Sequence, residues 1–280
     1  MIRSLAAAVL IQLLVQAPAT APPSLADAQR LFYNAHYQEA SALALSLRES
    51  GEYDLANDEV RTTALLFELR GLLKGQDAGN AANANKEAVL KACIKCPAVM
   101  AAFTADLHHG QELGRAALKK NPNDPVALFY LGKLDLNYVW LQLGLLGRKT
   151  GWDEYWEARK SLDALLKIDP KHVRGRVARG WIDYIVNTRM PWGTRWVLGG
   201  GNKKKGLATI REAAAAETDP FSHAEAEFAL WDILLRDKNE KDAIEVARRI
   251  AKAFPENGEV AAFLAKVTAP GQPARSGSRF

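Results

Sequence analysis

Cysteine is scarce in this sequence: only Cys93 and Cys96 occur among its 280 residues. With no cysteine near the N-terminus, a lipid-anchored form is not expected. A c-type haem site would need histidine directly after the second cysteine, where Pro97 stands. A zinc site would need two more ligands, and the nearby His108 and His109 would point about 100° apart on a helix. We therefore expect a local disulfide, as is usual in an oxidising compartment, with redox catalysis and metal binding as alternatives.

Alternating apolar and polar residues, the mark of a half-buried strand, occur nowhere over a useful length. Proline is nearly absent from the long segments rich in alanine and leucine, and it gathers at their ends, in the runs 121–125, 168–170 and 254–257. Proline cannot donate a backbone hydrogen bond inside a helix and restricts the residue before it, so these runs close helices. The sequence predicts an all-α fold.

A clustered basic face is also missing. The chain has 37 Lys and Arg residues against 32 Asp and Glu residues, a net charge of +5, but the two signs are interspersed along the expected helices. This pattern is typical of a solvated surface, whereas a nucleic-acid interface needs basic residues gathered on one side. We expect no nucleic-acid partner.

No catalytic constellation is visible. The histidines are scattered and none has an acid and a nucleophile at a telling spacing: they are His36, His108, His109, His172 and His223. The glycines at 199–201 and Gly206 do not form a phosphate-binding loop, because Leu207 stands where that motif requires lysine. Asn202 is instead expected to cap a helix. No enzyme activity, catalytic residue, cofactor or metal is predicted.

The N-terminal 24 residues have the layout of a secretory signal peptide and a short linker. Arg3 is followed by an apolar run over residues 5–15 and by small residues at 17–19 that suit cleavage after Ala19. The apolar run is too short to span a bilayer, which takes about 20 residues. The mature chain is expected to be exported, periplasmic or secreted, without a transmembrane segment.

Small residues recur with a fixed spacing. Gly132 and Ala158 are separated by 26 residues, and so are Gly180 and Gly206. A unit that recurs in this way is one supersecondary element that buries its apolar face by stacking on its neighbours. Glycine and alanine at such positions allow two helix backbones to cross closely.

The pattern resembles the tetratricopeptide repeat (TPR) family over residues 25–267. Its structural positions in this chain are Ala28, Ala40, Gly132, Ala158, Gly180, Gly206 and Ala243. The resemblance implies a right-handed α-solenoid of about five helix hairpins, two of which carry insertions of about 14 residues. It also implies one domain over 25–267, ended by a capping helix at 257–267. The tail at 268–280, rich in Gly, Ser and Pro, is expected to be disordered.

All seven tryptophans lie between residues 140 and 231, most of them in or beside the two insertions. One interpretation is that these aromatic side chains fill the core of the solenoid. The other is that the insertions form the wall of a binding pocket, since aromatic and arginine side chains are enriched in binding hot spots. On that interpretation the binding residues are Tyr138, Trp140, Trp181, Tyr184, Arg189, Trp192, Arg195 and Trp196.

Two functions fit these expectations. The first is a non-enzymatic protein-interaction scaffold or accessory factor of the cell envelope, holding an extended peptide or a helix on an open concave face. The alternative is a periplasmic small-ligand binder, because the chain also resembles TPR-like periplasmic components that accompany some solute transporters. A closed apolar cavity lined by Tyr138, Trp140, Trp181 and Trp196 would favour the alternative.

Overall fold

The computed structural model describes residues 22–48, 54–77 and 86–268. In these ranges the chain forms helices joined by turns, and no strand occurs in them. The predicted all-α class is confirmed. Residues 1–21 of the expected signal segment and residues 269–280 of the expected tail lie outside the described residues.

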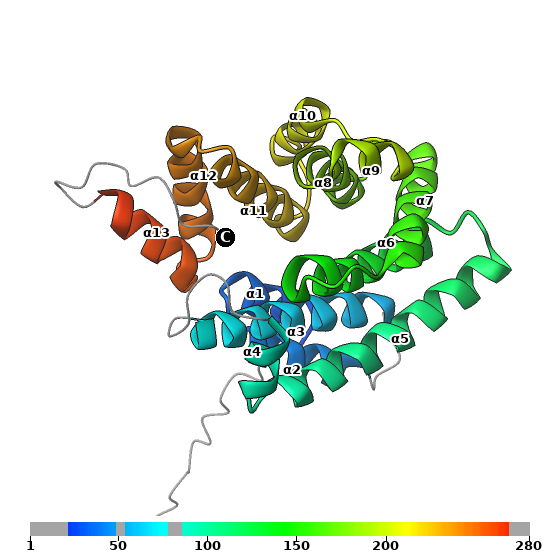
Figure 1. The fold of residues 1–280 in the computed structure, drawn as a ribbon, viewed down its shortest axis with the longest axis horizontal. Coiled ribbons are helices and arrows are strands. Elements are labelled where there is room, and N and C mark those ends of the chain that lie inside the picture. Colours follow the sequence, from blue (N-terminus) through cyan, green and yellow to red (C-terminus); the bar gives the residue numbers. More distant parts are fainter. Residues whose placement is uncertain (1–21, 49–53, 78–85, 269–280) are drawn as a thin grey trace, which may run out of the picture.

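Within the described ranges, ten helices pair into the five hairpins that were predicted, and Figure 1 shows the hairpins following one another along a curved path. The pairs are α1 (Leu25–Tyr33) with α2 (Tyr37–Arg48), α3 (Asp54–Asp77) with α5 (Cys96–Lys120), α6 (Pro125–Val139) with α7 (Trp152–Ile168), α8 (Val173–Arg189) with α10 (Lys203–Ala214), and α11 (Pro220–Arg236) with α12 (Glu240–Ala253).

Four further elements decorate this solenoid. The short α4 (Lys86–Ala92) precedes α5, and the π-helix η1 (Trp140–Leu146) continues α6 into the first insertion. The second insertion contains α9 (Trp192–Val197). The capping helix is α13 (Gly258–Thr268), which packs on α12.

Several helices begin where the sequence offers a side-chain cap. Asp124 accepts hydrogen bonds from the backbone N–H groups of the second and third residues of α6, and Asp219 does the same for α11. Each is followed by proline, which suits the first helical position because its missing N–H would be unpaired there. Asn202 accepts from the Lys205 N–H at 2.9 Å, which confirms the predicted cap of α10.

In two hairpins, α6–α7 and α8–α10, the helices cross at glycine. A Cβ atom on Gly132 would lie 3.0 Å from the Leu162 side chain and 3.4 Å from the Ala158 carbonyl oxygen. A Cβ atom on Gly206 would lie 2.5 Å from the Gly180 carbonyl oxygen, closer than real Cβ atoms approach. The small residues at the fixed spacing therefore lie where two backbones meet.

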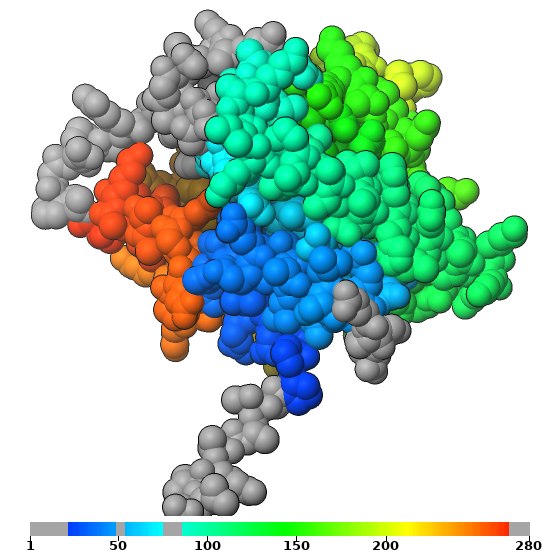
Figure 2. Space-filling view, turned by 90° about the horizontal axis from the view of Figure 1, so that it is seen from below, coloured from blue at the N-terminus to red at the C-terminus, as the bar shows by residue number. Residues whose placement is uncertain are grey.

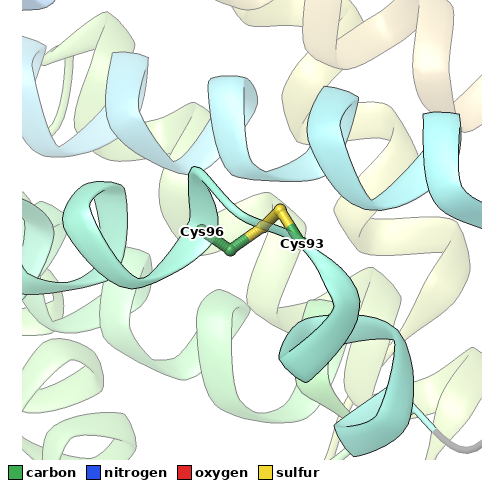
Figure 3. The surroundings of a disulfide bond; sticks show 2 residues. All are labelled: Cys93 and Cys96. Carbon is green, nitrogen blue, oxygen red and sulfur yellow. A yellow bond between two sulfur atoms is a disulfide. The ribbon is translucent and has the colours of Figure 1, made fainter.

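A disulfide joins Cys93 to Cys96 at the corner between α4 and α5 (Figure 3), with their Cα atoms 5.3 Å apart. Both cysteines are buried in an apolar cluster that also contains Phe103. The two helices meet here at a bend of 105°. In the described ranges no single helix has the length and apolarity needed to cross a bilayer, and only α4 and α5 taken together across this bend reach both.

The first hairpin contacts the last, so the solenoid closes into a ring. The Tyr33 ring of α1 lies 5.4 Å from Phe228 and 5.2 Å from Phe254, measured between ring centroids. Asn257 donates a side-chain hydrogen bond to the Tyr33 carbonyl at 2.7 Å. In Figure 2 the blue N-terminal hairpin adjoins the orange C-terminal helices.

Four charged side chains from four hairpins meet on the inner face: Glu59 (α3), Lys133 (α6), Arg174 (α8) and Glu225 (α11). We call them the inner charge ring. The Lys133 Nζ lies 2.6 Å from Glu225 and 3.6 Å from Glu59, and Arg174 donates to the same two carboxylates. All four side chains are at most 16% exposed.

Each buried charge in the ring faces two opposite charges, which offsets the cost of removing it from water. Burial by itself would raise the pKa of Glu225, but Arg174 and Lys133 lower it to about 2. The same carboxylates hold the pKa of Arg174 well above its usual value, against the effect of burial. Glu225 and Arg174 are therefore both ionised near neutral pH.

An open concave face able to hold a peptide or a helix was expected from the sequence. The structure differs, because the inner charge ring and the aromatic cluster around Tyr33 occupy the inner face where the first and last hairpins meet.

Candidate binding sites

Three of the predicted binding residues pack together where η1 meets α8. The Trp140 and Trp181 rings are in edge-to-face contact at 6.3 Å, and Trp181 contacts Tyr184 at 5.8 Å. The Arg236 guanidinium of α11 lies 5.9 Å from the Trp140 ring and 5.5 Å from the Trp181 ring. These side chains pack mainly against one another, and their contacts join the first insertion to the fourth and fifth hairpins.

The remaining predicted residues lie elsewhere. Tyr138 packs beside Gly151, and its ring would lie 3.5 Å from a Cβ atom built there. Trp196 is 85% exposed on α9, so the structure does not bring Tyr138, Trp140, Trp181 and Trp196 together around one cavity. Arg189 is exposed at the end of α8, and Arg195 donates its Nε–H to the Met190 carbonyl at 2.8 Å.

Trp192 is 87% exposed, and α9 contains no buried residue. The interpretation that all the aromatic residues of the insertions fill the core does not describe α9. The rings of Trp192 and Trp196 extend into solvent one helical turn apart.

A different concave site, which we call the rim cavity, lies at one rim of the ring where the N-termini of α6, α8 and α11 meet α1. Its volume is about 440 Å³. The lining residues are Gln29, Pro125, Val126, Phe129, Tyr130, Ile168, Asp169, His172, Arg174, Asp219, Phe221 and Ser222. The cavity thus combines aromatic walls with a few polar groups, as ligand sites do.

Two polar side chains of the rim cavity, His172 and Asp219, have defined protonation states near neutral pH. His172 caps α8 by accepting from the Gly175 N–H at 3.0 Å, and burial lowers the pKa of its ring. Burial opposes ionisation of Asp219, but hydrogen bonds from Ser222 and Phe221 hold its pKa below the usual value. The cavity therefore presents a neutral imidazole and an ionised carboxylate near neutral pH.

The positive charge at the cavity floor is already balanced. Arg174 stacks on Phe129, with 4.7 Å from the guanidinium carbon to the ring centroid, while its N–H groups face Glu59 and Glu225. The acidic lining residues are Asp169, which accepts from the Lys171 N–H, and Asp219, which accepts from the Phe221 and Ser222 N–H groups. An aromatic wall beside carboxylates suits a cationic or aliphatic group better than an anion.

The arrangement suits binding more than catalysis. His172 uses Nδ1 in its own helix cap, which occupies the nitrogen that a neutral imidazole would use as a base. Among the described residues, no group of three or more His, Cys, Asp and Glu side chains gathers as a metal site would require.

The rim cavity was not predicted from the sequence, because the tryptophans indicated a site in the two insertions instead. A signal was present: Asp-Pro pairs recur at 124–125, 169–170 and 219–220, and each starts or precedes a helix that faces inward. The pairs at 124–125 and 219–220 start α6 and α11, and the pair at 169–170 lies in the turn before α8, so all three mark helix N-termini at the same rim.

No family model and no curated protein matches this chain. Among solved structures, it is similar to a thermophilic TPR protein of Thermus thermophilus, with 16% identity and a TM-score of 0.43. The similarity covers 82% of this chain and 97% of the other. The assignment of a TPR-like helical repeat fold therefore rests on the hairpins and crossings described above.

Proposed function

We propose that this chain is a non-enzymatic interaction protein that binds a protein partner at the rim cavity, by enclosing a basic or aliphatic side chain of that partner. One observation carries the proposal: helices from four hairpins converge on a cavity of about 440 Å³ that is lined by aromatic side chains and by the carboxylates of Asp169 and Asp219. The rim cavity is a concave surface that a partner can reach, whereas the inner face is filled.

Val126 and Ile168 offer a way to test the site without disturbing the core. They line the cavity and are 56% and 46% exposed, so substitution there removes little packing. Val126→Lys places a cation where the partner's cation would lie. Ile94→Lys is the matched control, because Ile94 is 95% exposed at the α4–α5 corner and does not line the cavity.

The experiment is affinity capture from extracts of the source cells with the parent chain, Val126→Lys and Ile94→Lys. We expect a partner that the parent and Ile94→Lys retain and that Val126→Lys loses by about tenfold or more. Equal recovery of every protein by all three chains would contradict binding at this rim.

A second candidate uses the same cavity for a small molecule, because about 440 Å³ lies within the usual range of ligand pockets, roughly 300–1,000 Å³. Native mass spectrometry distinguishes the two functions. A retained small molecule that Val126→Lys releases would favour a periplasmic ligand binder or transporter accessory over a protein scaffold.

We further propose that the protein acts outside the cytoplasm, in the cell envelope or as a secreted factor. The support is the order of Arg3, the apolar run at 5–15 and the small residues at 17–19. Cell fractionation with intact-mass measurement tests this: the exported chain should begin after residue 19, and an unprocessed cytoplasmic chain would contradict it.

A further inference from the structure

The second insertion exposes apolar surface on α9 that no part of the described chain covers. Trp192 and Trp196 are 87% and 85% exposed, and the neighbouring Val197 is 61% exposed. Tryptophan is among the largest apolar side chains, so its usual place is a core or an interface. The exposure of two such rings on one short helix therefore indicates that something outside the described chain binds there.

The insertion is held firmly below this surface. Arg159 of α7 donates hydrogen bonds to the carbonyls of Leu198, Gly199 and Gly200, at 2.9, 2.8 and 3.2 Å. The Tyr155 hydroxyl donates to the Leu198 carbonyl at 2.8 Å, and the Leu198 side chain is buried. The tryptophans are thus presented outward by an anchored segment.

The sequence on either side of α9 carries charge of one sign. Residues 184–211 contain six Lys and Arg residues and no Asp or Glu. Lys203 pairs with Asp237 and Arg211 with Asp242. Arg189, Lys204 and Lys205 are exposed, so basic groups flank the aromatic helix on both sides along the chain.

We propose that this surface, made of Trp192, Trp196, Val197, Arg189, Lys204 and Lys205, docks on an anionic lipid bilayer. Indole rings favour the boundary between headgroups and acyl chains, and basic side chains beside them are attracted to anionic lipids. Each Lys or Arg near such a surface strengthens binding by roughly fivefold.

The size of the surface favours a bilayer over a protein. A stable protein interface buries about 800 Å² on each partner, and two indoles of roughly 150–250 Å² each with one valine fall short of that. A bilayer needs no matching shape, so a six-residue helix can enter its headgroup region.

A local probe tests the proposal in the full chain, independently of the apolar N-terminal run. Gly193 has nothing within 4 Å of a built Cβ atom, so Gly193→Cys can carry an environment-sensitive dye on α9. Ile94→Cys carries the same dye at the exposed α4–α5 corner as the matched control. Vesicles contain either phosphatidylcholine alone or equal parts of phosphatidylcholine and phosphatidylglycerol.

We expect the dye at Gly193→Cys to shift to the blue with anionic vesicles and not with neutral ones, and the dye at Ile94→Cys to stay unchanged. Lys204→Glu with Lys205→Glu should raise the lipid concentration needed by about tenfold or more. Lys119→Glu with Lys120→Glu, exposed at the end of α5, should leave it unchanged. Trp192→Ser with Trp196→Ser should weaken docking by a similar factor.

Equal shifts at both dye positions, equal shifts with both vesicles, or no shift at all would overturn membrane docking. A protein partner lost on Trp192→Ser with Trp196→Ser, without any vesicle response of the parent, would assign the surface to that protein instead. Circular dichroism of each variant checks that the fold is retained.

Discussion

The two insertions of this solenoid have the same place in their repeats and a similar richness in tryptophan, yet one is packed inside and the other faces outward. In the first, η1 continues α6 without a break, and Leu141 and Leu146 are buried in the cluster shared with α3 and α5. In the second, α8 stops at Arg189 and Pro191 follows. Because proline ends the helix, the chain changes direction and α9 leaves the core. The break between helices, rather than the aromatic content, therefore determines whether an insertion is buried or exposed.

The largest expected effect separates the buried side chains of the first insertion from the exposed ones of the second. Leu141 is 1% exposed, and Leu141→Ala should lower the free energy of unfolding by about 2–5 kcal/mol through lost burial and a cavity. Trp196→Ala should change it by less than about 0.5 kcal/mol. Urea unfolding followed by circular dichroism measures both, and equal losses would show that the two insertions do not differ in burial.

A second expected effect compares two glycines of the same hairpin. Gly206→Ala would place its Cβ atom 2.5 Å from the Gly180 carbonyl oxygen, and overpacking of this kind costs about 1–3 kcal/mol. Gly193→Ala meets nothing within 4 Å and should gain up to about 1 kcal/mol of helix propensity on α9. Thermal melting should therefore move in opposite directions, and a neutral Gly206→Ala would contradict the close crossing of α8 and α10.

A third expected effect concerns what holds the second insertion in place. Arg159→Met removes the donors to three carbonyls at 198–200, which should free this segment at a local cost of about 1.5 kcal/mol. Limited proteolysis should then cut first within residues 190–201. Lys160→Met, at the exposed neighbouring position, is the control, and the same cleavage rate in both variants would show that Arg159 is not the anchor.

The last expected effect is a pH dependence arising beside the first insertion. Burial, with a contribution from Glu157, raises the pKa of Asp135 to about 8. From its unfolded value near 3.8 up to about 8, the folded state keeps a proton that the unfolded state releases. Stability should thus fall as pH rises, by at most about 1.4 kcal/mol per pH unit.

Two variants check the origin of that slope. Asp135→Asn should flatten the dependence of unfolding free energy on pH between 5 and 8 and stabilise the chain at pH 7. Asp183 holds the equivalent position one repeat later and pairs with Arg179 at 2.8 Å. Asp183→Asn should instead lower stability at pH 7 by up to about 1 kcal/mol. Effects of the same sign would contradict the different surroundings of the two carboxyls.

Local signals made much of this fold predictable. The spacing of Gly132 with Ala158 and of Gly180 with Gly206 located the hairpin crossings, because only small residues allow backbones to approach so closely. Asn202 located the start of α10 for an equally local reason, since its side chain caps a backbone N–H three residues on.

Long-range features could not be predicted in this way. Closure of the ring brings Tyr33 next to Asn257, and it depends on rotations that accumulate over all hairpins and leave no mark at any single residue. Trp192 and Trp196 are four residues apart, which places them on one helix face but does not say whether that face is buried. Their exposure and the position of the rim cavity follow from tertiary packing.

The inner charge ring affects how this protein unfolds. A linear array of repeats can fray from either end, because each unit touches only its neighbours. Here Glu59, Lys133, Arg174 and Glu225 tie together the second to fifth hairpins, and Tyr33 joins the first to the last. Loss of any of the second to fifth hairpins would leave buried ions of the others unpaired, and loss of the first would expose the aromatic contacts of Tyr33. The array should therefore unfold as a single cooperative block.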